Sequence, residues 1–144
     1  MDDLFLWAHL GFLAVALYGI IDADSQAFAW MRGKTPTIAE HHLKRTHWVV
    51  TIGLAGLILT GLYLYWPMRA YLYGQAYFIT KMVFVLALLV NSFFIERLMP
   101  LASQFEHKNL PAWQKRILTL SGGVSTLSWL GAVLLAILQF GWPF

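Results

Sequence analysis

Four long apolar runs, separated by short polar connectors, dominate the pattern of this chain. The runs cover residues 4–21, 48–66, 76–95 and 117–140. A hydrocarbon layer of about 30 Å needs about 20 helical residues, so each run is long enough to cross it. Charged residues fall mainly between the runs, whereas a water-soluble amphipathic helix carries them along one face. The pattern predicts an all-α integral membrane protein of one domain, residues 1–144, whose four transmembrane helices form an antiparallel up-down bundle.

The composition predicts that these runs lie in a lipid bilayer. Of the 144 residues, 59% are apolar, and the mean hydropathy of +0.62 lies outside the range of soluble domains. The chain has no cysteine, which excludes disulfide frameworks, thiolate metal sites, iron–sulfur clusters and covalent haem attachment. The first run follows Asp2 and Asp3 instead of a basic segment, so we interpret it as a retained span and not as a signal peptide.

The basic residues are distributed unevenly between the two sides of the predicted bundle. Arg69 lies on one side, whereas the other side carries eight: Arg32, Lys34, Lys44, Arg45, Arg97, Lys108, Lys115 and Arg116. The positive-inside rule therefore predicts cytoplasmic first and third connectors, with both termini outside a bacterial inner membrane. This bias also explains the net charge of +3, so we expect no nucleic-acid partner.

Several residues predict where the helices begin, end and approach one another. Thr37 is the expected N-cap of a short helix that leads into the second span, while Pro67 closes that span and Pro100 lies beyond the third. Tryptophans mark the outer boundary at Trp7, Trp66 and Trp142, and the inner boundary at Trp48 and Trp113. Small residues share one face on two spans, Gly53, Gly56 and Thr60 on the second and Ser121, Ser125 and Ser128 on the fourth. Such faces predict close helix packing.

Polar side chains inside the spans are the candidates for chemistry, because they are expensive in lipid. The predicted topology places His9 and Lys81 near the outer face and His47 near the inner face. Each also has a purely structural interpretation. His9 can hydrogen-bond to a Ser, Tyr or Gln of a neighbouring span, Lys81 can extend its ammonium to the boundary, and His47 can lie among the lipid headgroups.

His47 begins a strip of residues at helical spacing, which continues through Thr51, Leu54, Ile58 and Gly61. An imidazole at the head of such a strip can bind haem iron while the residues below it cover the porphyrin. Lys44 and Arg45 would then neutralise the propionates at the membrane surface.

The stretch around His47 resembles a known family of haem proteins. Arg45-Thr46-His47-Trp48, followed by Thr60-Gly61 and Pro67, is similar to the first span of the membrane cytochrome b subunits of nickel–iron hydrogenases and formate dehydrogenases. The resemblance implies that His47 ligates haem b near the cytoplasmic side, with Arg45 beside it.

The chain as a whole is also similar to a second group, the small four-span proteins around bacterial membrane protoporphyrinogen oxidase and the copper-resistance D protein. The matching features are a histidine early in the first span, a basic connector before the second, and a lysine early in the third; here these residues are His9 and Lys81. This resemblance implies a porphyrin or metal site in the outer layer.

A second group of possible metal ligands lies in the connectors. Glu40, His41 and His42, with His47 and the pair Glu106-His107, have side chains suited to copper or zinc. On one helix His42 and His47 would face about 140° apart, unlike the i, i+4 pair of a metal-binding helix.

These observations leave three functions open. The first is a b-type cytochrome-like protein that binds haem b for electron transfer or porphyrin redox chemistry, an oxidoreductase component with His47 or His9 as the iron ligand. The second is a non-catalytic accessory subunit of a larger membrane redox or photosynthetic complex, with other membrane subunits or a homo-oligomer as partners. The third is copper handling through His9, His42 and His47.

Overall fold

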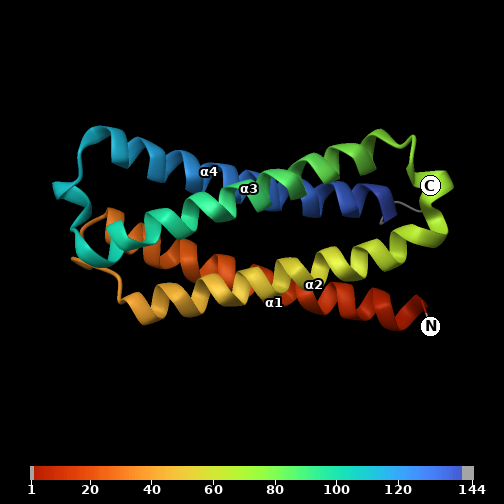
Figure 1. The fold of residues 1–144 in the computed structure, drawn as a ribbon, viewed down its shortest axis with the longest axis horizontal. Helices are drawn as coiled ribbons and strands as arrows, with labels where there is room; N and C mark the ends of the chain where they lie inside the picture. The colour runs from red at the N-terminus through yellow and green to blue at the C-terminus, as the bar shows by residue number, and fades with distance from the viewer. Residues whose placement is uncertain (1, 141–144) are drawn as a thin grey trace.

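The computed structural model describes residues 2–140, and the side chains of residues 3–138. Its four long helices are α1 (Asp2–Met31), α2 (Glu40–Leu72), α3 (Ala76–Gln104) and α4 (Ala112–Phe140), and a short 3-10 turn, η1 (His107–Asn109), precedes α4. Figure 1 shows that successive helices run antiparallel, so that the first and third connectors share one end of the bundle. The antiparallel four-helix bundle predicted from the sequence is confirmed.

All four helices are long and apolar enough to cross a membrane. In the most apolar segment of each helix, only 11% to 22% of the residues are buried inside the bundle. Large hydrophobic side chains cover the outside, a surface suited to lipid and not to water. The four described tryptophans of the predicted belts, Trp7, Trp66, Trp48 and Trp113, are all exposed. Trp142, the remaining belt residue, lies outside the described part of the chain.

The helices extend beyond the predicted spans. Thr37 is not a helix cap, because α2 begins at Glu40 with Ala39 at the N-cap position. Pro67 does not close α2, which continues to Leu72, and Pro100 lies inside α3. A proline removes one backbone hydrogen bond, whereas ending the helix near apolar surroundings would expose several unpaired backbone groups. Continuing the helix therefore costs less free energy than breaking it.

The small-residue face of α2 packs against α1. A Cβ atom on Gly53 would lie 2.9 Å from the Cα of Ala16, and one on Gly56 would overlap the ring of Phe12. Only glycine at these two positions allows the helices to approach this closely. The predicted role of the Gly53–Gly56–Thr60 face in helix packing is confirmed.

A polar pair joins α3 to α4 in the middle of the bundle. The amide nitrogen of Asn91 donates a 2.9 Å hydrogen bond to the carbonyl oxygen of Ser121, and the Ser121 hydroxyl donates one of 2.9 Å to Oδ1 of Asn91. Both residues are buried. The pair uses the serine face predicted on the fourth span and satisfies two polar side chains that lipid cannot hydrate.

The bundle consists of two helix pairs, α1 with α2 and α3 with α4 (Figure 1). Their central contact is a buried cluster of Ala16, Leu54, Leu88 and Trp129. A second cluster lies at the end of the bundle where the first and third connectors meet, which we call the connector end. It contains Trp30, Ile38, Ala102 and Leu110. There the backbone N–H of Ile38 donates to the carbonyl of Ala102 at 2.8 Å, and the Trp30 indole donates to the Phe105 carbonyl at 3.0 Å. These bonds tie the first connector to the end of α3.

The α1–α2 contact predicts different outcomes for two Gly-to-Ala substitutions. Gly53→Ala should lower the free energy of unfolding by about 1–3 kcal/mol, since the added methyl group must push against the α1 backbone. Gly122→Ala is the matched control, because no atom lies within 4 Å of its Cβ position; it should be neutral or stabilising by up to about 1 kcal/mol. Thermal unfolding in detergent measures both. Equal destabilisation by the two variants would contradict the close approach.

Candidate functional site

His9 on α1 forms a hydrogen bond with Thr60 on α2, with 2.7 Å between Nδ1 and Oγ1. Gly61 leaves room for the ring, because a Cβ atom there would lie 3.4 Å from Cε1 of His9. Thr60 is buried and His9 half-buried. The expected hydrogen bond to a neighbouring span is present, although the partner is a threonine and not the expected Ser, Tyr or Gln.

The geometry around Thr60 determines which nitrogen of His9 carries the proton. The Thr60 hydroxyl has one hydrogen and donates it to the Gly56 carbonyl at 2.7 Å. If the hydroxyl proton did not lie between them, Thr60 Oγ1 and the Gly56 carbonyl oxygen would repel each other at this distance. Thr60 Oγ1 therefore accepts from His9, so Nδ1 is the donor. In a neutral imidazole the lone pair then lies on Nε2, the nitrogen that can bind a metal or accept a proton.

Lys81 on α3 belongs to the same part of the bundle. The side chain is half-buried and lies five residues after the start of α3, at the same end of the bundle as the start of α1 (Figure 1). Among the described residues, no carboxylate forms a salt bridge with it. We call the His9–Thr60 pair, together with Lys81 near the same end of the bundle, the outer cluster.

His47 lies at the opposite end of α2 from the outer cluster. It is 13 residues from Thr60 along one helix, a separation of about 20 Å at 1.5 Å per residue. His9 and His47 therefore lie far apart along the bundle. The strip that follows His47 is covered by α1, since Leu54 packs on Ala16 and Gly61 lies beside His9. That face of α2 has no room for a flat cofactor in this packing.

Asp22 on α1 is the centre of an inner polar cluster. Its Oδ2 accepts hydrogen bonds from Thr46 at 3.0 Å and Gln26 at 2.9 Å, and lies 3.6 Å from Nε2 of His42. Among the described residues, neither Asp22 nor Asp24 forms a salt bridge with Lys44, Arg45 or Arg97. Lys44 instead pairs with Glu40 at 2.7 Å, one turn away on the same exposed helix surface, and the hydroxyl of Thr126 bonds to Asp24.

The remaining candidates do not join these clusters. Arg45 is exposed, and Glu106 pairs with Lys108. His107 packs edge-on against Trp30 with 5.1 Å between ring centroids; burial, and secondarily the charge of Lys115, lowers its pKa below the usual value. No three His, Asp or Glu side chains in the described part of the chain are grouped as metal ligands.

Comparison with known proteins gives no family for this chain. No protein-family model, curated protein or solved structure matches it. The assignment of function therefore depends on the geometry of the chain itself.

Sequence reasoning selected His9 and Lys81 but not Thr60 as a member of their site. Thr60 was assigned to the packing face with Gly53 and Gly56 because of its spacing and size. The sequence gives only a weak signal for Thr60: a helical threonine that donates to the carbonyl four residues earlier keeps its lone pairs for a neighbouring helix, but Thr51, Thr80 and Thr119 form the same bond.

The hydrogen bond to Thr60 predicts the tautomer of His9. In protein labelled with ¹⁵N-histidine, the His9 signals should report a proton on Nδ1 in the wild type and in Thr60→Ser, which keeps the hydroxyl. Thr60→Val is nearly isosteric and removes the acceptor, so it should shift the ring toward the Nε2-protonated form. The His9→Asn spectrum assigns the signals. An unchanged tautomer in Thr60→Val would show that Thr60 does not orient the ring.

Proposed function

We propose that this chain is an integral membrane b-type cytochrome-like protein, which binds haem b and takes part in electron transfer or porphyrin redox chemistry. The observation that carries the proposal is the hydrogen bond from His9 Nδ1 to Thr60. Imidazoles that ligate metals characteristically donate the other ring N–H to a fixed acceptor, which sets the tautomer and the ring orientation. Haem b, when bound, supplies a one-electron redox centre.

The outer cluster has side chains that suit such a cofactor. His9 would ligate the iron through Nε2, Thr60 would hold the ring, and Lys81 would pair with a propionate carboxylate. His47 and Arg45 are the second candidate ligand and cation, at the other end of the bundle. The covered strip below His47 favours the outer cluster, because a cofactor lying along it would have to displace α1 from Leu54.

We propose further that the protein lies in a bacterial inner membrane with its basic connectors in the cytoplasm and both termini outside. The excess of cations on the first and third connectors supports this orientation. The fold is compatible with it, since these connectors share one end of the bundle (Figure 1). The outer cluster would then lie toward the outer surface.

Absorption spectra of the oxidised and reduced protein, purified after haem-sufficient expression, test the haem proposal. The wild type should show a Soret band, and His9→Ala should lose most of the bound haem because the iron loses its ligand. His41→Ala is the matched control, as this histidine is exposed and hydrogen-bonds nothing in the outer cluster; it should keep the band. Loss of the Soret band in His47→Ala but not in His9→Ala would identify His47 as the iron ligand. A colourless wild type would overturn haem binding.

A second candidate is a non-catalytic accessory subunit of a larger membrane redox or photosynthetic complex. The observation in its favour is how little of the described chain lies outside the helices: only three residues, 73–75, separate α2 from α3. Most of the surface is apolar side chain, which suits lipid and neighbouring membrane subunits. Purification in mild detergent separates the two candidates, because an accessory subunit would co-migrate with larger redox partners and carry no haem of its own.

Copper handling is a third candidate with less structural support. His9 lies on α1, far from His42 and His47 in the first turns of α2, and Nε2 of His42 lies 3.6 Å from Asp22. Metal analysis of the isolated protein tests it directly, since stoichiometric copper would favour this role.

A further inference from the structure

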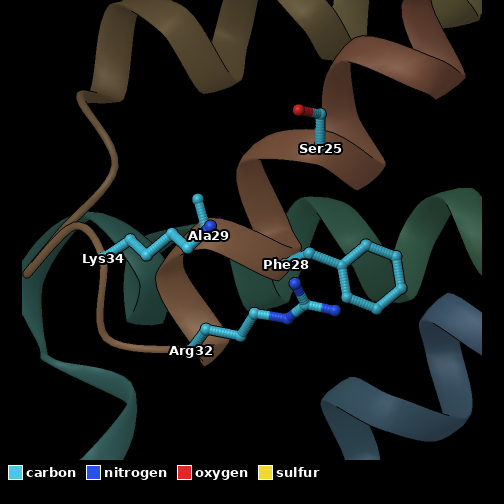
Figure 2. Close-up of a pocket in the computed structure, with 5 residues that line it drawn as sticks. All are labelled: Ser25, Phe28, Ala29, Arg32 and Lys34. Carbon is cyan, nitrogen blue, oxygen red and sulfur yellow. The ribbon is translucent and has the colours of Figure 1, made fainter.

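The connector end of α1 carries a shallow pocket of about 290 Å³ that neither cluster uses. It is lined by Ser25, Phe28 and Ala29 of α1 and by Arg32 and Lys34 of the first connector. Figure 2 shows the Arg32 guanidinium beside the Phe28 ring and the Lys34 side chain ending beside Ala29. Two cations therefore border one patch of the helix surface, together with a hydroxyl and an aromatic ring.

The end of α1 places these two cations by a specific turn. The N–H of Gly33 donates to the Trp30 carbonyl at 3.1 Å, and the N–H of Lys34 donates to the Ala29 carbonyl at 2.9 Å. These two bonds form a Schellman motif, which requires a left-handed residue; Gly33 has φ of +74°. The turn folds Lys34 back over the last turn of the helix, on the side where Arg32 already lies.

Neither Arg32 nor Lys34 forms a salt bridge with another of the described residues. Among the described residues, the salt bridges are His42 with Asp22, Lys44 with Glu40, and Lys108 with Glu106. Arg32 instead lies over the Phe28 ring, 5.9 Å from its centroid. A pocket with two such cations fits an anionic ligand.

We propose that this pocket binds the phosphate of an anionic phospholipid headgroup, with Arg32 and Lys34 as the charged contacts and Ser25 as a hydroxyl donor. Its position favours a lipid over a free ion, because it lies at the connector end of α1, the helix that carries the first apolar run. Phe28 is 56% exposed on the same surface and offers an apolar contact for the first part of an acyl chain. Basic pockets at the ends of membrane helices are suited to such headgroups.

Native mass spectrometry of the protein released from nanodiscs of phosphatidylglycerol and phosphatidylcholine tests the proposal. The wild type should retain phosphatidylglycerol in preference to phosphatidylcholine. The double variant Arg32→Gln/Lys34→Gln should weaken that retention by about 10- to 30-fold, since each cation near an anionic surface contributes roughly a factor of five. Arg32→Lys/Lys34→Arg, which keeps both charges, should retain most of the preference.

The matched control is Lys44→Gln/Lys108→Gln, which removes the same number of charges from residues that already have carboxylate partners. It should retain the lipid as the wild type does. If the control lost as much phosphatidylglycerol as the double variant, the proposed site would be wrong, because lipid retention would then depend only on net charge. Inorganic phosphate provides the second arm: if millimolar phosphate displaces the lipid and the protein shows no preference between the two lipids, the pocket binds free anions and the lipid assignment is wrong.

Discussion

The close approach of α1 and α2 is the contact on which the rest of the structure depends. Gly53 and Gly56 have no Cβ atoms, so α1 can lie against the α2 backbone at Ala16 and Phe12. Lipid gives no hydrophobic reason for two apolar helices to associate, and close van der Waals packing must supply it. The same approach brings His9 within 2.7 Å of Thr60. A packing contact thus creates the geometry of the candidate site.

Two pairs of polar side chains link helices within the bundle. Asn91 with Ser121 joins α3 to α4, and Asp22 with Thr46 joins α1 to α2. Each bond replaces water that the bilayer cannot supply. His9 differs from these residues, because only Nδ1 is used in its bond to Thr60. The other ring nitrogen, Nε2, then carries a lone pair that can bind a metal. This difference is why the proposed chemistry is assigned to the outer cluster and not to the other polar pairs.

The two proposals concern opposite ends of the bundle and depend on different physics. The outer cluster depends on hydrogen-bond direction at Thr60, in surroundings of low dielectric. The pocket at Arg32 depends on two cations that have no salt-bridge partner in the described part of the chain and that the turn at Gly33 holds in place. A lipid held there would contact the end of α1, which the Trp30 indole already ties to the Phe105 carbonyl. Neither proposal requires the other to be correct.

The sequence by itself determined the solvent, the number of spans and the candidate residues, because apolar run length and the rarity of polar groups in lipid are local properties of the chain. It also placed His9 and His47 at opposite ends, since depth follows from residue number. The contacts of each candidate depend on how the helices pack. Rotation of each helix about its axis is set by packing, so the coverage of Leu54 by α1, the choice of Thr60 as partner and the helical path through Pro67 could not be deduced from spacing alone.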